Sequence, residues 1–200
     1  VSDDGGLGVG RLLHVDATEL GGATVRASGV DVGAQLSIKT RGGGSLNLEL
    51  LGNWIGKYEV ADVPDAPVRD QVGLASINGT VAPWRLFARA EWWSPSEAQG
   101  IALNTRYRAP VDDVDLRGHR TGRTLRPPVR IDVDSFMRLD EIAGGSTQAL
   151  FGDVTLSLGI LNLLNVRSPV SQVQGDLGFD PSDWDNCGRM YYLSLSMPLP

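Results

Sequence analysis

The chain has 200 residues, enough for one sizeable domain, and its 42% hydrophobic and 21% charged residues are typical of a folded protein rather than a disordered one. A net charge of −6, without a block of basic residues, argues against a nucleic-acid-binding protein, because phosphates require a basic face. The one cysteine, Cys187, excludes an intrachain disulfide, and no cysteine and histidine cluster predicts a metal site.

No apolar run is long enough for a transmembrane helix, and the most apolar stretch, residues 154–164, contains Gly and Asn. A membrane-spanning strand, in contrast, needs only ~9–11 residues and gives a weaker signal. Alternating hydrophobic and polar residues predict such strands along most of this chain, and no segment predicts a helix.

The first predicted strands are residues 29–39 and 46–59, joined by a glycine-rich turn at 40–45. Each places aliphatic side chains on one face and polar ones on the other, and in 46–59 the hydrophobic face is expected to include Trp54 and Tyr58. A weaker strand is predicted at about 71–80, followed by a turn at 80–83.

The clearest alternation lies in residues 84–93, WRLFARAEWW, which predict a strand with one hydrophobic and one charged face. Trp84 and Trp92 share the hydrophobic face. Their spacing corresponds to roughly 20 Å of height at ~3.3 Å per residue and ~40° tilt, close to the distance between the aromatic girdles of a membrane barrel. We expect this strand to ascend from a short turn, with Trp84 at its lower end, to a long outer loop.

The next connection, 94–128, is predicted to be long and irregular, with room for a short protruding hairpin at 100–109. The remaining predicted elements are strands at 129–140, 151–164 and 189–197, with a turn at 141–148 and a long loop at 165–188.

The predicted connections are short at one end (40–45, 80–83, 141–148) and longer at the other (60–70, 94–128, 165–188). This asymmetry is typical of a membrane β-barrel, which has short periplasmic turns and long outer loops. Hydrophobic faces would then contact lipid, and charged side chains would line the interior and pair with one another or with a plug. A soluble β-sandwich also alternates, so the pattern favours the barrel without excluding the sandwich.

Three short motifs lie in the last third of the chain: Asn162-Leu163-Leu164-Asn165, Gly178-Phe179-Asp180-Pro181 and Gly188-Arg189-Met190-Tyr191-Tyr192. In this order they resemble the end of TonB-dependent outer-membrane receptors. Upstream, ATVRASGVDVGAQL, GSLNLELLGNWIGKYE and VRIDVDSFMRLD resemble earlier strands of that family, so the resemblance covers about 23–200. The chain departs from the family at Met197–Pro200, where an aromatic end is usual; either residues are missing or the assembly signal is degenerate.

The resemblance implies an all-β fold, an antiparallel meander forming about the last seven strands of a transmembrane β-barrel that has twenty-two in the family. Residues 1–200 would be the C-terminal portion of that barrel, with 1–22 the remnant of an extracellular loop or strand and 23–200 about seven barrel strands. Seven strands leave two unpaired edges, which lipid does not tolerate. The other strands, the N-terminal plug and the TonB box are therefore expected outside this sequence.

The implied function is active uptake of a scarce nutrient, of the siderophore, cobalamin or carbohydrate class, across the outer membrane of a Gram-negative bacterium. Such transport needs no catalytic residue, metal or cofactor, so we expect no enzyme activity. The expected partners are outer-membrane lipid, the rest of the barrel with its plug, the TonB complex and a small-molecule substrate. The alternative is a soluble β-sandwich that binds a ligand or carbohydrate, for example through Trp92, Trp93 or Trp184.

Two loops carry the candidate substrate-binding residues. Loop 165–188 places an aromatic ring among acids, which suits a sugar ring or a cation, although such a composition is also that of a solvated turn. Loop 94–128 carries basic residues that would attract an anionic ligand such as a ferric siderophore, or would simply face lipopolysaccharide or solvent. The candidates are Asp180, Asp183, Trp184, Asp185, Arg117, His119 and Arg120.

Overall fold

The computed structural model describes residues 24–61, 67–139, 154–171, 178–181 and 186–197, and within these ranges the protein is all-β. The strands are β1 (Thr24–Lys39), β2 (Ser45–Ala61), β3 (Arg69–Asp70), β4 (Leu74–Ser76), β5 (Gly79–Val81), β6 (Trp84–Trp93), β7 (Gln99–Arg108), β8 (Val111–Val114), β9 (Arg120–Leu125), β10 (Arg130–Arg138), β11 (Thr155–Leu161) and β12 (Met190–Ser196).

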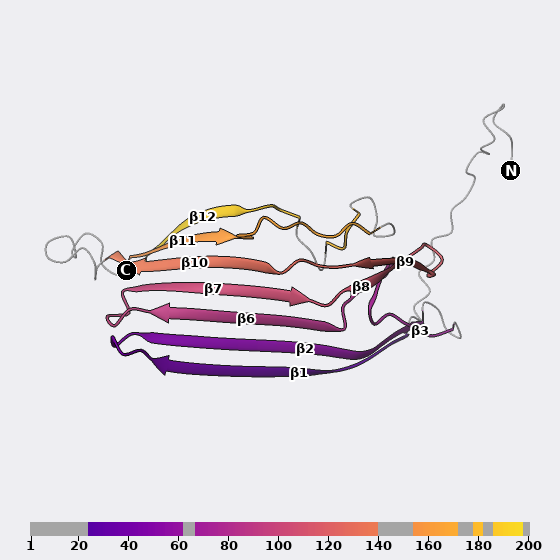
Figure 1. The fold of residues 1–200 in the computed structure, drawn as a ribbon, viewed down its shortest axis with the longest axis horizontal. Coiled ribbons are helices and arrows are strands. Elements are labelled where there is room, and N and C mark those ends of the chain that lie inside the picture. Colours follow the sequence, from indigo (N-terminus) through magenta and orange to yellow (C-terminus); the bar gives the residue numbers. More distant parts are fainter. Residues whose placement is uncertain (1–23, 62–66, 140–153, 172–177, 182–185, 198–200) are drawn as a thin grey trace, which may run out of the picture.

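Seven of these strands form one antiparallel meander in the order β1-β2-β6-β7-β10-β11-β12, with the short β3 alongside β2 (Figure 1). The expected all-β antiparallel meander is therefore confirmed. Within the described residues the sheet is open, with β1 and β12 as its two edges. The predicted turn at 40–45 is also confirmed, and Gly43 adopts a positive φ of 87° there.

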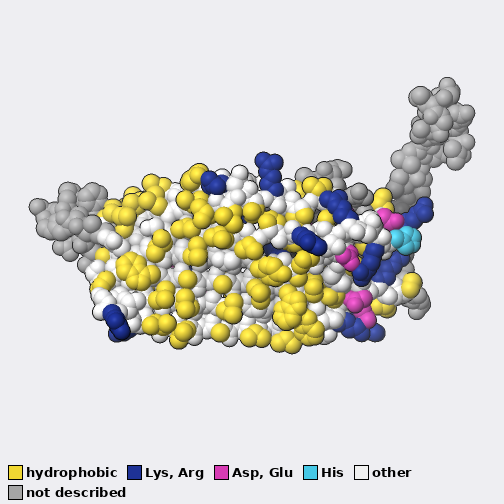
Figure 2. All heavy atoms as spheres, viewed as in Figure 1, with side chains coloured by type: hydrophobic (Ala, Val, Ile, Leu, Met, Phe, Trp, Pro, Cys, Tyr) yellow, Lys and Arg dark blue, Asp and Glu magenta, His cyan; other side chains and the backbone are white. Residues whose placement is uncertain are grey.

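The pairing register gathers the hydrophobic residues of successive strands on one face, which we call the apolar face. Trp84 of β6 lies opposite Trp54 of β2, and Trp92 at the other end of β6 lies opposite Leu46. The next strands continue the face with Leu103 opposite Ala90. Large side chains on this face are exposed, from Val32 (64%) on β1 to Leu193 (68%) on β12. Figure 2 shows this side of the molecule covered with hydrophobic side chains.

Two strand predictions were wrong. Residues 71–80 do not form a meander strand; they contribute β4 and part of β5 to a separate small sheet. Residues 99–108, expected within a loop, form β7, a full strand between β6 and β10. The reason is that strand 84–93 is followed by a tight turn, in which Ser94 donates its backbone N–H to the Gln99 carbonyl at 2.8 Å.

One predicted meander strand, 71–80, is lost and one, 99–108, is gained, so the number of meander strands is unchanged. As a result, β6 runs in the direction opposite to the predicted one. It begins at the end where the 62–83 and 109–129 connections lie and runs toward the 40–44 and 94–98 turns (Figure 1). Trp84 therefore lies at the long-connection end, which we call the loop end, and Trp92 lies at the turn end. Short and long connections still alternate in the described chain, but two predicted connections were wrong: the short turn at 80–83 belongs to a long connection, and the long loop at 94–128 is divided by β7. The predicted turn at 141–148 lies outside the described residues.

A β-bulge between β1 and β2 separates Trp54 from Tyr58. Trp54 pairs with Val30, and Tyr58 pairs with Ala27. Val30 and Ala27 are three residues apart, so they lie on opposite faces of β1. The prediction that Trp54 and Tyr58 share a face was therefore wrong, because the bulge reverses the alternation between them. A side chain at Gly29 would place its Cβ 2.3 Å from the Trp54 carbonyl oxygen, so the bulge requires glycine there.

The small sheet lies at the loop end, in the order β5-β4-β8-β9, with β4 and β8 parallel. It joins the 62–83 connection to the 109–129 connection. Its core consists of Ala75, Ala82, Val111 and Leu125. The buried hydrophobic core is therefore small and local, whereas the long sheet keeps its large hydrophobic residues on the surface.

Candidate functional site

The face of the long sheet opposite the apolar face is polar, and a hydrogen-bonded chain crosses it from β6 to β12. Arg89 donates to the Asn104 side-chain oxygen (3.0 Å), and Asn104 donates from Nδ2 to Asp134 (2.7 Å). The Tyr192 hydroxyl donates to the other Asp134 oxygen (2.6 Å). Because an added Cβ at Gly159 would lie 2.1 Å from the Tyr192 ring, this glycine leaves the space through which the ring reaches Asp134.

A second group on the same face centres on Asp132, which is 2% exposed. It accepts bonds from the Arg106 and Arg130 guanidiniums and from the backbone N–H of Asn162 (2.7 Å). Ion pairs also form along single strands, as between Arg89 and Glu91 (2.7 Å). Some charged residues of the polar face therefore pair with one another as expected. Arg106 and Asp132 pair across strands, and Arg89 and Glu91 pair along one strand.

The motif residues Asn162 and Asn165 link the ends of the last strands. Both adopt positive φ, 55° and 53°. Asn162 is buried and exchanges bonds with the Val166 backbone, donating to its oxygen (2.8 Å) and accepting from its nitrogen (2.9 Å). Asn165 accepts a bond from the backbone N–H of Arg189 (2.9 Å) just before β12. This turn therefore positions the start of the last strand.

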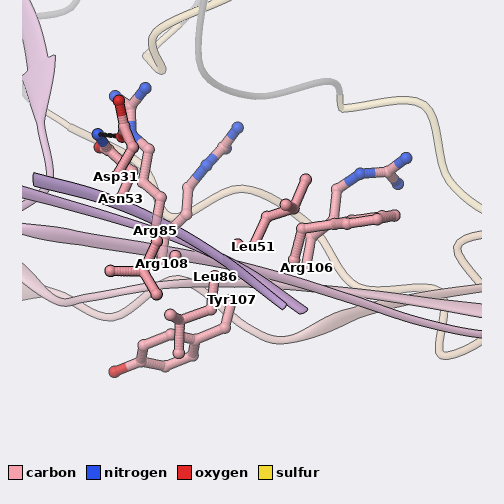
Figure 3. A pocket seen from close by; sticks show the side chains of 12 residues that line it. Asp31, Leu51, Asn53, Arg85, Leu86, Arg106, Tyr107 and Arg108 are labelled. Atoms are coloured by element: carbon pink, nitrogen blue, oxygen red, sulfur yellow. Dashed lines mark hydrogen bonds between the residues drawn. The ribbon is translucent and has the colours of Figure 1, made fainter. Parts of the chain in front are cut away.

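Three arginines from β6 and β7 extend from the polar face at a hollow of about 450 Å³ (Figure 3). They are Arg85, Arg106 and Arg108, and Arg85 lies directly opposite Arg108 in the register. On the neighbouring strands, Asn53 donates a hydrogen bond to Asp31 at 2.6 Å. Arg106 is bonded to Asp132, and Arg85 donates to the Thr80 carbonyl oxygen (3.4 Å), so these guanidiniums join neighbouring strands and tie the long sheet to β5.

Sequence reasoning missed this hollow. Arg106 and Arg108 belong to β7, and β7 was expected to be part of a loop. The alternation in GIALNTRYRA was the signal that could have found them, because it places Asn104, Arg106 and Arg108 on one face.

Of the candidates in loop 165–188, Asp180 is described, whereas Asp183, Trp184 and Asp185 lie outside the described residues. Asp180 is 7% exposed and accepts a hydrogen bond from the backbone N–H of Thr80 in β5 (2.8 Å). A second hydrogen bond connects this loop to the small sheet: the Ser171 hydroxyl donates to the fully buried Asp113 of β8 at 2.7 Å. The β11–β12 connection is thus fixed to both other loop-end connections.

Arg117, His119 and Arg120 lie together at the β8–β9 hairpin. Arg120 pairs with Asp112, and His119 lies 3.4 Å from Asp115. Asp180 contacts β5, and β4 separates β5 from β8. The structure therefore gathers the three basic candidates at one hairpin and places the acidic candidate on another part of the small sheet.

The hairpin turn is organised by Asp115, which is half-buried and accepts bonds from the backbone N–H groups of His119 (2.8 Å) and Arg117 (2.9 Å). The bond from His119 is the main reason why the pKa of Asp115 lies below its usual value of 3.8, and the bond from Arg117 and the charge of His119 add to the effect. The ionised carboxylate is therefore the form that holds the turn.

Two tryptophans considered for carbohydrate binding do not share a surface. Trp92 lies on the apolar face, whereas Trp93 lies on the opposite face and packs against Phe136, with ring centroids 4.2 Å apart. Cys187 is an exposed thiol. Among the described residues, no three acidic, histidine or cysteine side chains gather as a metal site would require.

The described ranges contain no helix long and apolar enough to cross a membrane. The main surface features of the described protein are the two faces of the long sheet and the loop end, whose connections are joined by hydrogen bonds. Comparisons with protein-family models, with curated proteins and with solved structures found no match for this chain.

Proposed function

We propose that this chain forms part of the wall of a TonB-dependent outer-membrane receptor, with its apolar face toward lipid and its polar face toward the transport lumen. The observation that carries the proposal is the continuous exposed apolar face across seven strands, with indole rings at both ends. Trp54 and Trp84 lie at the loop end with ring centroids 6.1 Å apart, and Trp92 lies at the turn end.

The distribution of buried and exposed residues supports a lipid-facing wall. The largest fully buried side chains in the described residues are Val114, Asn162 and Asp113, whereas the large aliphatic and aromatic side chains are exposed. A soluble monomer rarely exposes a continuous apolar patch larger than a few hundred Å². In a bilayer the same face is favourable, since lipid contacts replace the missing core, and the edges of β1 and β12 would pair with the other strands of the barrel.

The choice of family rests on the sequence resemblance, and the geometry of the motif residues is compatible with it. Asn162 and Asn165 form the turn that leads from β11 toward the last strand. The transported substrate would be a scarce nutrient of the siderophore, cobalamin or carbohydrate class, as the resemblance implies. The site of this activity would be the outer membrane of a Gram-negative bacterium, with the plug and TonB contacts supplied by other parts of the protein.

A soluble β-sandwich is the competing function class. It would need a second layer over the apolar face, and in the described ranges the second sheet lies at the loop end and packs its own small core. The wide exposure of the apolar face therefore favours lipid over a sandwich core.

The test is a site-directed spin-labelling scan of β6 in the full natural protein, reconstituted in phospholipid bilayers, with Cys187 replaced by serine. Nitroxides at positions 86, 88 and 90 are expected to collide with oxygen, which concentrates in lipid. Nitroxides at 87, 89 and 91 are expected to collide with a water-soluble nickel complex. The adjacent pair Ala88→Cys and Arg89→Cys forms the matched control.

Two results would reject the membrane proposal. One is a protein that stays monomeric without detergent and does not enter bilayers. The other is a scan in which both sets of positions show the same oxygen collision rate.

A further inference from the structure

Gly100 of β7 lies between two side chains from strands that do not pair with each other. It is opposite Trp93 of β6 on one side and opposite Phe136 of β10 on the other. The two rings meet across the glycine, with centroids 4.2 Å apart. An added Cβ at Gly100 would lie 2.1 Å from the Phe136 ring, so this ring occupies the space that a side chain would fill.

Gly159 of β11 lies in the same arrangement. It is opposite Asp134 of β10 and opposite Tyr192 of β12, and these two side chains form a hydrogen bond across it at 2.6 Å. An added Cβ at Gly159 would overlap the Tyr192 ring. We call these two arrangements the glycine crossings. Because Asp134 and Phe136 are two residues apart on one face of β10, the crossings together link β6, β10 and β12 on the polar face.

Both glycine crossings include a strand pair that is joined by a long connection. Residues 109–129 separate β7 from β10, and residues 162–189 separate β11 from β12. In a hairpin with a tight turn, the turn fixes the register, as the 40–44 turn does for β1 and β2. A long connection leaves the register open, so contacts within the sheet must set it for these two pairs.

Alternating polarity restricts the register of these strands but does not fix it. A shift by one residue would turn the hydrophobic side chains to the polar face, whereas a shift by two keeps every side chain on its own face. For β12, a shift by two would place the Tyr192 ring opposite Ser157 or Leu161. Both residues carry a side chain where Gly159 carries none, so the ring fits the sheet at the observed register.

We propose that Gly100 and Gly159 fix the register of the long sheet, because each admits an aromatic ring of the neighbouring strand at one alignment among those that polarity allows. The offset between strands, summed around a barrel, sets the strand tilt and the barrel diameter. The two glycines would thereby determine the width of the transport lumen. This consequence rests on the proposed function, whereas the control of register does not.

The test is disulfide cross-linking between β11 and β12 in the full natural protein, with Cys187 replaced by serine. The pair Ser157→Cys, Ser194→Cys reports the observed register, because these residues lie directly opposite each other. The pairs Ser157→Cys, Ser196→Cys and Thr155→Cys, Ser194→Cys report shifts by two residues in either direction. In the observed register these pairs are diagonal, ~7 Å apart and too distant for a disulfide. The parent protein should therefore cross-link the first pair and neither of the others.

Two variants should redistribute the cross-links. In Gly159→Val every alignment places a side chain under the Tyr192 ring, so the first pair should lose cross-linking and a shifted pair should gain it. Tyr192→Ala should have the same effect because no ring remains to select an alignment, and it adds no atom that could obstruct folding. Cross-linking confined to the first pair in Tyr192→Ala would overturn the inference.

The matched control is Gly33→Val, at a polar-face glycine in the β1–β2 hairpin. Cross-linking of Ser37→Cys with Asn47→Cys, which lie opposite each other, should be unchanged in this variant, because the 40–44 turn fixes that register. Failure of the proposed function is distinguishable. It appears as loss of the alternating spin-label pattern in β6, whereas the cross-links report the strand register whether the apolar face contacts lipid or not.

Discussion

Asp180 accepts a hydrogen bond at its carboxylate from the backbone N–H of Thr80, 2.8 Å away, although the two residues lie 100 positions apart. This bond joins the β11–β12 connection to β5 of the small sheet. Together with the Ser171–Asp113 bond, it makes the loop end one connected unit rather than three independent loops. The position of any ligand-binding residue in these connections therefore depends on contacts between them.

Replacing Asp180 with alanine should loosen this unit. The loss of a hydrogen bond to a buried, charged acceptor costs about 1.5–3 kcal/mol. The Thr80 amide should then exchange with deuterium roughly 10-fold faster or more, measured by hydrogen-exchange mass spectrometry. The exposed Asp70→Ala change provides a control, because its side chain bonds locally to Val72. Unchanged exchange at Thr80 in the Asp180 variant would contradict this role.

A methyl group at Gly159 should disrupt the bond between Tyr192 and Asp134. The added Cβ would overlap the Tyr192 ring, so Gly159→Ala should destabilise the protein by about 1–3 kcal/mol. Gly42→Ala is the control, since its Cβ would meet no atom within 4 Å. The measurement is the free energy of unfolding in denaturant. Equal stability of the two variants would show that Tyr192 can move at no cost.

The two faces of β6 should respond oppositely to charge. Ala88→Arg places a cation on the apolar face and should reduce assembly in the outer membrane, because an arginine at the middle of a bilayer costs ~2–4 kcal/mol on a barrel's lipid face. Arg89→Ala, one residue away on the polar face, should still assemble. Membrane fractionation of the full natural protein measures both. The reverse outcome would place the apolar side in a soluble core.

The β8–β9 turn should weaken in acid. Because the pKa of Asp115 is lowered on folding, its contribution to stability is present above its usual value of 3.8 and is lost as pH falls through the lowered pKa. NMR chemical shifts of the Arg117 and His119 amides should therefore move together in that low pH range. Asp115→Asn should abolish this titration, and a titration that survives the substitution would assign it to another group.

Part of the fold follows directly from residue order. Strand 84–93 agrees with β6, and the hydrophobic positions of 29–39 and 84–93 share one face as expected. The alternation of these residues allows few other arrangements, since shifting a strand by one residue would turn every hydrophobic side chain to the polar face. Strand 99–108 was missed because its alternation is imperfect: Ala102 lies on the polar face and Thr105 lies on the apolar face.

The sequence by itself determined that this chain is all-β, that its strands alternate in polarity, and that connections of different length separate them. These properties are local, since side-chain direction reverses at every residue of a strand. Only the tertiary structure decided which segment was strand β7, which way β6 runs, and that Asp180 bonds to Thr80. Those features depend on pairing between residues far apart in the chain, and local alternation carries no information about which distant segment will be the partner.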